Sequence, residues 1–181
     1  MNKAFFLDRD GTINVEIGYL HEAEKTQLLP RVAEAIELIH RAGYLAIVVT
    51  NQSGVAKKMY PVDNIHEVHA RIQRDLLAFS PQAVIDAWYY CPHDPKITGE
   101  CSCRKPLPGM LVKAAADFGV DPGESFMIGD RMSDVNAGIS AGCAGVCMVT
   151  TGDGNIQDAD DASVVLAPDL YSAVEKLLKT R

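Results

Sequence analysis

The sequence predicts an α/β fold in which helices flank a parallel sheet in three layers, as in Rossmann-like folds. Short apolar runs of strand length alternate with amphipathic segments of helical spacing along the chain. This alternation is typical of parallel sheets with right-handed crossovers. The chain has 181 residues, of which 48% are hydrophobic and 23% charged. That size and composition suit one domain over residues 1–181.

The N-terminal half contains two expected strand–helix units. Residues 5–8 begin apolar and end in an aspartate, which favours a buried strand followed by a loop. After Pro30, apolar residues recur at helical spacing until Gly43, which predicts a helix ended by a glycine. Residues 44–50 form a continuous apolar run, the second strand, and the amphipathic segment at about 62–79 is the second helix.

The C-terminal half continues the alternation with shorter elements. The expected strands lie at 87–91, 125–130, 144–149 and 163–167, and the expected helices at 108–118, 133–141 and 170–178. Gly119 follows the first of these helices, where a glycine commonly ends one. In open parallel sheets, ligands bind beyond the carboxyl ends of the strands. Polar residues at several strand ends therefore predict one shared crevice.

The end of the first strand carries the most informative motif, F-F-L-D-R-D-G-T at residues 5–12. Side chains two positions apart on a strand point the same way, so Asp8 and Asp10 can converge where the strand ends. Two convergent carboxylates suit Mg²⁺ binding and a division of nucleophilic and acid–base work. A strand followed by a plain Asp-Gly turn explains this fragment equally well when it is taken alone.

Two further strand ends carry polar groups. The segment T-N-Q-S-G at 50–54 offers hydroxyl and amide donors for phosphate oxygens, although an ordinary strand-to-helix loop has a similar composition. Asp130 ends another strand and could complete an oxygen shell around Mg²⁺ with Asp8. Asp134 falls in the first turn of the next helix, where a carboxylate also stabilises the helix N-terminus, so a structural role and a direct role both remain open.

Arg104 and Lys105 are adjacent cations in an otherwise acidic chain. Lysine offers a point charge for a phosphoryl group, and arginine a planar fork for other substrate oxygens. A solvated surface pair is the usual explanation for such neighbours. Here Pro106 and Pro108 follow directly, which holds the pair in a defined loop.

Net charge and apolar pattern limit the classes of partner. A net charge of −7 argues against a nucleic-acid binder, which normally has a basic face. No apolar run approaches the length that spans a membrane, and the first strand begins too early to leave room for a signal peptide. We therefore expect a cytoplasmic protein, a monomer without nucleic-acid or membrane partners.

A group of potential zinc ligands lies between the third strand and the Arg-Lys pair. Cys91 and His93 precede a short loop, and Cys101 and Cys103 follow it. Three thiolates and one imidazole complete a tetrahedral Zn²⁺ shell, and a site with no open position is structural. Free thiols are the alternative, whereas Cys101 and Cys103 are too close in sequence to favour a disulfide. The loop would then be braced by zinc.

Other reactive side chains carry no predicted function. His66 and His69 are too closely spaced for a metalloprotease motif and are expected on a helix surface. Cys143 and Cys147 are expected to be small core residues. The acidic residues at 158–161 are expected to form a surface turn.

With these motifs assembled, the chain resembles the haloacid dehalogenase (HAD) superfamily of phosphotransferases. Four motifs match in order: D-R-D-G-T, the Thr of T-N-Q-S-G, the Lys of C-R-K-P, and G-D-R-x-x-D. Together with C-P-H…C-x-C-R-K-P they resemble a zinc-containing group that includes heptose-bisphosphate and histidinol-phosphate phosphatases. The stretches I-N-V-E-I-G-Y-L-H, V-T-N-Q-S-G-V-A, Y-Y-C-P-H-D-P and R-K-P-L-P-G-M-L are more similar to the heptose-bisphosphate enzymes.

The resemblance implies a mechanism and a cofactor. Asp8 would be the nucleophile and Asp10 the general acid and base. Mg²⁺ would be held by Asp8, the Asp10 carbonyl and Asp130. Thr50 and Lys105 would stabilise the transferring phosphoryl group. Because no long insertion separates these motifs, only a minimal cap over an open crevice is expected.

The resemblance also implies a substrate class. The favoured activity is removal of the 7-phosphate from a heptose 1,7-bisphosphate, on the route to lipopolysaccharide-core or related glycan precursors. The residues expected to bind the sugar bisphosphate are Glu16, Gly18, Tyr19, Asn51, Gln52, Ser53, Arg104 and Arg131. Arg131 stands where heptose-bisphosphate phosphatases often carry lysine, and either residue supplies a cation. The alternatives are a histidinol-phosphate phosphatase and a catalytically silent zinc module that binds partners.

Overall fold

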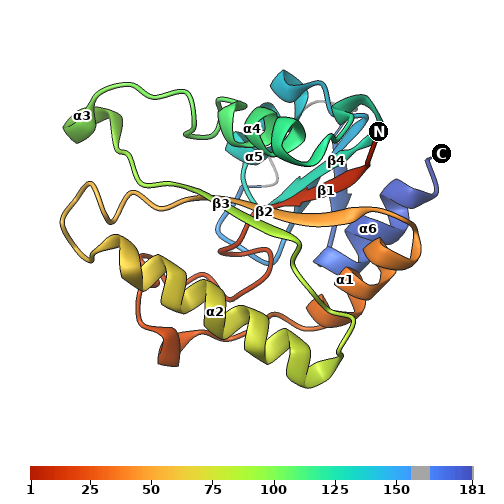
Figure 1. The fold of residues 1–181 in the computed structure, drawn as a ribbon, viewed down its shortest axis with the longest axis horizontal. Helices are drawn as coiled ribbons and strands as arrows, with labels where there is room; N and C mark the ends of the chain where they lie inside the picture. The colour runs from red at the N-terminus through yellow and green to blue at the C-terminus, as the bar shows by residue number, and fades with distance from the viewer. Residues whose placement is uncertain (156–163, 181) are drawn as a thin grey trace.

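A computed structural model describes residues 1–155 and 164–180 and shows a sheet between two sets of helices (Figure 1). In this part of the chain one sheet runs in the order β3-β2-β1-β4-β5-β6, with all neighbouring strands parallel. The strands are β1 (Ala4–Leu7), β2 (Leu45–Asn51), β3 (Ala87–Cys91), β4 (Phe126–Gly129), β5 (Gly145–Val149) and β6 (Val165–Ala167). The predicted α/β fold class is confirmed.

Two sets of helices cover the sheet. One face packs against α1 (Val32–Arg41), α2 (Val62–Phe79) and α6 (Leu170–Leu178), and the other against α4 (Gly109–Phe118) and α5 (Met132–Ala141) (Figure 1). All five helices agree with the sequence prediction. The short helices η1 (Ala23–Lys25), α3 (Pro95–Thr98) and η2 (Pro122–Glu124) were not predicted, because a single turn is too short to show a hydrophobic period.

Strand β1 is apolar at every position because both of its faces are covered. Phe5 and Leu7 pack into the core beneath α1, α2 and α6, whereas Ala4 and Phe6 pack into the core beneath α4 and α5. All four side chains are fully buried. Continuous apolar runs of this kind are typical of parallel strands buried on both sides. Their burial fixes the strand whose end carries Asp8.

The register of the central strands places the polar residues at one edge of the sheet. Leu7, the last residue of β1, is paired with Val48 of β2 and Ile128 of β4. The Asp8 backbone N–H then donates to the Ile128 carbonyl at 2.9 Å. Asp8 therefore stands beside the ends of β2, which contains Thr50, and β4, which Asp130 follows directly.

No helix in the described residues is both long enough and apolar enough to cross a membrane. The expectations of a single domain over residues 1–181 and of a cytoplasmic monomer stay predictions. The acidic turn expected at 158–161 and Ser163, the first residue of the strand expected at 163–167, lie outside the described part of the chain. Val164 is described and precedes β6.

Candidate active site

A cavity of about 390 Å³ opens at the carboxyl ends of the central strands. The residues predicted to be catalytic, Asp8, Asp10, Thr50 and Lys105, all line it. They come from segments far apart in the sequence, and the sheet brings them together. Asp8, Thr50 and Lys105 are buried in its base.

Lys105 is a buried cation between two carboxylates. Its Nζ lies 2.6 Å from Asp8 Oδ1 and 2.6 Å from Asp134 Oδ1, and it donates to the Val49 carbonyl at 2.7 Å. Burial alone would lower the pKa of Lys105, but the charges of Asp134 and Asp8 outweigh that effect and raise it. Lys105 is therefore a fixed positive charge beside Asp8.

The backbone of Lys105 is also fixed, by the side chain of Asn51 at the end of β2. Asn51 Nδ2 donates to the Lys105 carbonyl at 3.0 Å, and the Lys105 N–H donates to Asn51 Oδ1 at 3.1 Å. Asn51 was predicted to bind substrate, and it does line the cavity. Its amide is nevertheless used on both sides by the loop that carries Lys105.

Three buried carboxylates, those of Asp8, Asp130 and Asp134, each place an oxygen within 4.8 Å of the others. Burial raises the pKa of Asp8 to about 8 despite the opposing charge of Lys105, and Asp134 and Asp130 add to the rise. Burial, with the charge of Asp134, also raises the pKa of Asp130. Asp130 Oδ1 is buried and has no hydrogen-bond partner among the described residues. Hard oxygen ligands with excess negative charge and an unsatisfied oxygen fit a Mg²⁺ ion.

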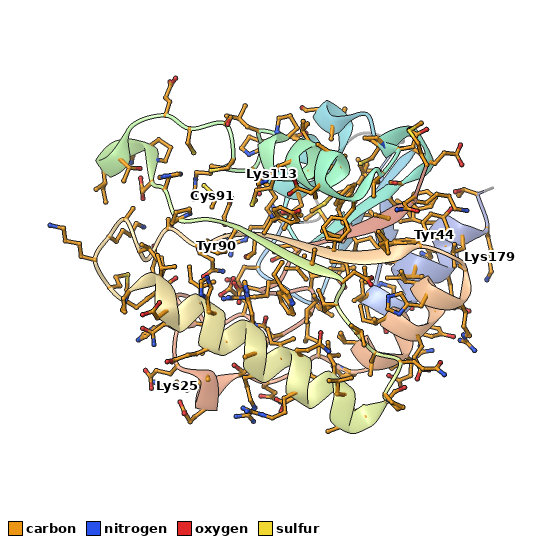
Figure 2. The ribbon with its side chains drawn as sticks, in the orientation of Figure 1. Lys25, Tyr44, Tyr90, Cys91, Lys113 and Lys179 are labelled. Carbon is orange, nitrogen blue, oxygen red and sulfur yellow. The ribbon has the colours of Figure 1, made fainter. Side chains whose placement is uncertain are left out.

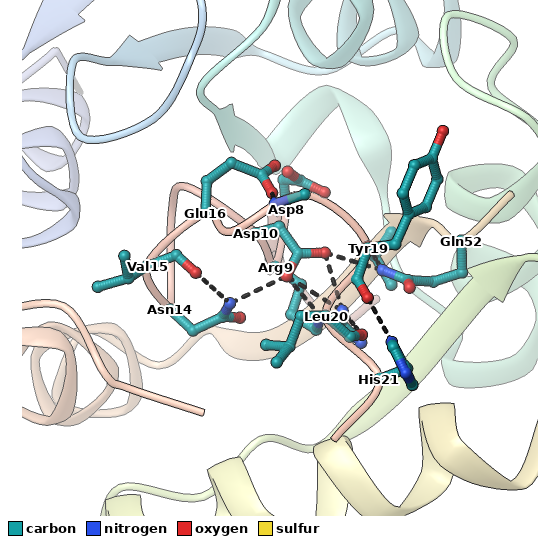
Figure 3. A network of polar contacts seen from close by, with 12 residues as sticks. Asp8, Arg9, Asp10, Asn14, Val15, Glu16, Tyr19, Leu20, His21 and Gln52 are labelled. Atoms are coloured by element: carbon teal, nitrogen blue, oxygen red, sulfur yellow. Dashed lines mark hydrogen bonds and ion pairs between the residues drawn. The ribbon is translucent and has the colours of Figure 1, made fainter. Parts of the chain in front are cut away.

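The side chain of Asp10 is not part of this cluster of three carboxylates. It has a hydrogen-bond network of its own (Figure 3). Arg9 Nε and Nη2 donate to Oδ1 at 3.2 and 3.0 Å, and Nη2 donates to Oδ2 at 2.9 Å. Asn14 Nδ2 donates to Oδ1 at 2.9 Å, and Gln52 Nε2 donates to Oδ2 at 2.8 Å. Gln52 also donates to Thr50 Oγ1 at 3.0 Å, which links the two predicted catalytic residues.

All the residues predicted to bind substrate line the cavity: Glu16, Gly18, Tyr19, Asn51, Gln52, Ser53, Arg104 and Arg131. Asp134, whose role the sequence left open, also lines the cavity, and the lining residues that the sequence interpretation missed are Lys57, Tyr60, Ser133 and Asp153. Arg131 Nη2 lies 3.2 Å from Glu16 Oε2, so a cation and an anion from distant loops meet at the cavity wall. Lys57 donates to the Tyr19 hydroxyl, a contact between two loops that no local pattern indicates.

A second cluster of potential metal ligands, the Cys/His group, lies beside the loop that leads to Lys105. It consists of Cys91, His93, Cys101 and Cys103. One ligand atom of each residue lies within 4.8 Å of the others, and five of the six separations run from 2.9 Å for Cys91–Cys103 to 3.7 Å for Cys91–Cys101. A tetrahedral Zn²⁺ with bonds of about 2.0–2.3 Å would hold such atoms roughly 3.5–3.8 Å apart. All five cysteines of the chain are free thiols. The predicted residues are thus assembled with spacings close to a zinc shell.

The strand β3 directs neighbouring side chains to opposite sides of the sheet, and this places Cys91 with the loop. Figure 2 shows Cys91 and Tyr90 on opposite sides of β3. Cys91 joins the core beneath α4, whereas Tyr90 meets the rings of His66 and His69 on α2. Arg104 Nη1 donates to the His93 carbonyl at 3.2 Å, so the group is connected to the cavity wall.

The prediction that His69 lies on a helix surface is wrong. His69 is buried and stacks on Trp88 with ring centroids 4.4 Å apart. Burial, with the charges of Arg9 and His66, lowers the pKa of His69 to about 2, so the ring is neutral. His69 shares the apolar face of α2 with Ile65 and Ile72, a helical spacing that could have indicated its burial. Cys147 is a buried core residue, as predicted.

The fold and the strand-end residues define the class of protein, and comparison with known families agrees. A family model described as HAD-hydrolase-like matches residues 102–175. Among solved structures, the D,D-heptose 1,7-bisphosphate phosphatase from B. bronchiseptica, complexed with magnesium and phosphate, has a TM-score of 0.88 and 30% identity and covers 100% of both chains. The chain is therefore an HAD-like hydrolase.

Comparison with curated relatives identifies the family within the HAD-like hydrolases. The D-glycero-D-manno-heptose-1,7-bisphosphate 7-phosphatase of Thermosynechococcus vestitus is 41% identical over 95% of this chain and 93% of its own. The D-glycero-beta-D-manno-heptose-1,7-bisphosphate 7-phosphatase of Escherichia coli is 34% identical over 97% of this chain and 95% of its own. The chain belongs to the D-glycero-D-manno-heptose-1,7-bisphosphate 7-phosphatase family. The resemblance described from the sequence motifs is confirmed.

Proposed function

We propose that the protein is a Mg²⁺-dependent phosphatase that removes the 7-phosphate of D-glycero-D-manno-heptose 1,7-bisphosphate. The observation that carries the proposal is Asp8 itself, a carboxylate at the end of β1 held at 2.6 Å by the buried Lys105. Family membership over nearly the whole chain supports this substrate. The activity serves the formation of heptose precursors for lipopolysaccharide or related glycans.

In the first step an Asp8 carboxylate oxygen attacks the phosphorus atom of the 7-phosphate. A phosphorus–oxygen bond forms to Asp8, and the bond from phosphorus to the sugar oxygen O7 breaks. The electron pair of that bond stays on O7, which takes a proton from Asp10 and leaves as an alcohol. The Lys105 ammonium and the Thr50 hydroxyl stabilise charge on the transferring phosphoryl group.

In the second step water hydrolyses the aspartyl-phosphate. Asp10, now a carboxylate, takes a proton from the water as the water oxygen bonds to phosphorus. The bond between phosphorus and Asp8 breaks and inorganic phosphate leaves. Asp8 returns as a carboxylate and Asp10 as an acid, so both residues are ready for another turnover.

The carboxylates of Asp8 and Asp130, with the backbone carbonyl of Asp10, would hold the Mg²⁺. Bound there, the ion would keep Asp8 in its charged form and neutralise phosphoryl oxygens. Asp134 reaches the same space, but one of its oxygens is 2.6 Å from Lys105 Nζ and the other accepts from the Arg131 N–H at 3.0 Å. We assign Asp134 to holding Lys105 and the start of α5.

Substrate recognition falls to the loops around the cavity. Arg104 and Arg131 supply cations for the second phosphate, and Glu16 with Tyr19 supplies acceptors and donors for sugar hydroxyls. The Cys/His group would hold a structural Zn²⁺ that braces the loop delivering Arg104 and Lys105. The zinc contributes to catalysis only through that loop.

A phosphate-release panel tests the proposed function. The substrates are both anomers of the heptose 1,7-bisphosphate, heptose 7-phosphate, histidinol phosphate and p-nitrophenyl phosphate, each with and without Mg²⁺. We expect the highest kcat/KM for a 1,7-bisphosphate and no turnover without Mg²⁺. A preference for histidinol phosphate would reassign the substrate, and no turnover of any ester would leave only a binding module.

A further inference from the structure

We propose that Arg9 is a positioning residue that fixes the Asp10 carboxylate for proton transfer, with Oδ2 as the oxygen that carries the proton. The inference rests on the proposed function, since it adds a residue to the acid–base step. Arg9 lies between the two aspartates of the D-R-D-G-T motif, and no function is predicted for it from the sequence alone.

Arg9 reaches Asp10 from inside the protein. Its side chain has no exposed surface, and it is the largest fully buried side chain in the described part of the molecule. Asp8 and Asp10 line the cavity, but Arg9 does not. Because adjacent residues of an extended chain point to opposite sides, Arg9 starts away from the cavity. The arginine side chain is long enough for its guanidinium to reach Asp10 from the side away from the cavity, where it does not contact substrate.

The contact between Arg9 and Asp10 is a fork with little freedom. Nε and Nη2 donate three hydrogen bonds to the two carboxylate oxygens at 2.9–3.2 Å. Asp10 is the one carboxylate paired with Arg9 in the described residues. A planar guanidinium that donates from two nitrogens fixes both the place and the plane of a carboxylate.

The donors are unequally shared between the two oxygens, and this identifies the proton carrier. Oδ1 accepts from Arg9 Nε, from Arg9 Nη2 and from Asn14, which exceeds its two lone pairs. Oδ2 accepts only from Arg9 Nη2 and from Gln52 Nε2, and Gln52 lines the cavity. Oδ2 therefore has the fewer donors and lies beside the cavity-lining Gln52, and we assign to it the proton exchanged with O7 and with water, which takes the place of the Gln52 contact.

The cost of burying Arg9 points to function more than to stability. A buried ion pair gains little over apolar residues of the same volume, because desolvation offsets the attraction. Arg9 Nη1 is buried without a hydrogen-bond partner among the described residues, an added cost. Arg9 Nη2 also donates to the Leu20 carbonyl at 3.4 Å, but its three shorter hydrogen bonds all go to Asp10, which fits a positioning role.

Leaving-group dependence tests the role of Arg9. The value of kcat/KM covers steps up to the first irreversible one, the transfer of phosphate to Asp8. A sugar alkoxide needs a proton from Asp10 to leave, whereas p-nitrophenolate leaves readily without one. We expect Arg9→Met to lower kcat/KM for heptose 1,7-bisphosphate at least about tenfold more than for p-nitrophenyl phosphate, within the roughly 10²–10⁴-fold that a general acid supplies.

Arg9→Lys keeps the charge but loses the fork, and it should show the same selectivity to a smaller degree. It also serves as the test variant if Arg9→Met does not fold. Ile72→Ala, which opens a cavity in the core beneath α2, controls for lost stability and should lower both values alike. Equal losses on both esters in the Arg9 variants would overturn the positioning role.

A double-variant cycle separates action through Asp10 from any other route. In an Asp10→Asn background, Arg9→Met should produce no further selective loss on the sugar ester. A further selective loss there would overturn the proposal, because Arg9 would then act without Asp10. If the unmodified protein hydrolyses neither ester, the proposed function fails instead, and the two failures are distinguishable.

Discussion

The protein has two clusters of potential metal ligands near Lys105, the three carboxylates and the Cys/His group, and they differ in how the chain assembles them. Asp8, after β1, is distant in the chain from Asp130 and Asp134, which flank the start of α5, and the pairing of β1 with β4 brings the three together. The Cys/His group comes from the single segment 91–103. The first group is wholly buried, whereas in the second only Cys91 is.

Because the two clusters are assembled differently, different parts of the structure hold them in place. Asp8 and Asp130 directly follow core strands, Asp134 lies in the first turn of α5, and Asp8 and Asp134 share the charge of Lys105, so the fold supports these carboxylates without a metal. Beyond Cys91, which ends β3, the segment to Cys103 has only one element of regular structure, the one-turn helix α3, and α3 buries no residue. We therefore expect damage to the carboxylate group to remove chemistry, and damage to the Cys/His group to remove structure first.

The largest effect is expected from Asp8→Asn. An amide is a poor nucleophile and a poor Mg²⁺ ligand, so turnover of heptose 1,7-bisphosphate should fall by at least about 10³-fold. The free energy of unfolding should not fall, because burial already disfavours the charged form of Asp8 and Lys105 keeps its ion pair with Asp134. Phosphate release and thermal melting measure the two effects.

Asp117→Asn is the matched control, since it makes the same chemical change on the exposed face of α4. It should leave turnover as in the unmodified protein. Appreciable turnover by pure Asp8→Asn protein would contradict the covalent mechanism. Loss of folding in that variant would contradict the view that the core alone supports the carboxylates.

The double variant Cys101→Ala/Cys103→Ala is expected to have the next largest effect. It should lose bound zinc and at least about 2.7 kcal/mol of stability, the contribution of a ligand present at a hundred times its Kd. Turnover should fall indirectly as the loop before Lys105 loosens. Metal analysis and chemical denaturation measure the two changes.

Cys143→Ala/Cys147→Ala changes the same number of thiols outside the Cys/His group. Cys147 packs in the core and should cost some stability, but the zinc content should stay unchanged. If both double variants contain as much zinc as the unmodified protein, the ligands have been assigned wrongly.

The same contrast explains how much could be predicted from the sequence. The Cys/His group could be identified from spacing alone because its ligands are local. Asp8 and Asp130 could be identified because parallel strands end at one edge of the sheet. The forked contact of Arg9 could not, because no periodicity governs a residue just beyond a strand. Lys57 and Tyr19 meet only through the packing of two loops.

The pH dependence of stability should distinguish the carboxylate group again, with a smaller effect. Because the pKa of Asp8 is raised from 3.8 to about 8, the metal-free protein should lose stability as the pH rises from about 4 to about 8. Mg²⁺ pairs with the charged form and should offset that loss. We expect the stabilisation by Mg²⁺ to be about 1–2 kcal/mol larger at pH 8 than at pH 5. This lies within the upper limit for one titrating group, which is ~1.4 kcal/mol per pH unit.

Thermal melts with and without added Mg²⁺ measure this difference, without chelators that would also remove zinc. Asp8→Asn should flatten the pH dependence, whereas Asp117→Asn should not. A Mg²⁺ effect that is equal at both pH values would show that Asp8 does not contribute to the cation site.

Arg104 joins the two groups, and its substitution is expected to have the smallest effect. Arg104 Nη1 donates to the His93 carbonyl, and its side chain also lines the cavity. Lys105 is nearer to Asp8, which leaves Arg104 free to bind a remote phosphate or hydroxyl. Losing a remote contact lowers kcat/KM mainly for the substrate that makes it.

We therefore expect Arg104→Ala to lower kcat/KM for heptose 1,7-bisphosphate at least about tenfold more than for p-nitrophenyl phosphate, which corresponds to one charged contact. Zinc content should not change, because one hydrogen bond to a ligand's carbonyl is a small part of that loop's support. Equal losses on both esters would place Arg104 at the reacting phosphate instead. A loss of zinc would make Arg104 part of the Cys/His structure, and the two groups would then be less independent than their construction indicates.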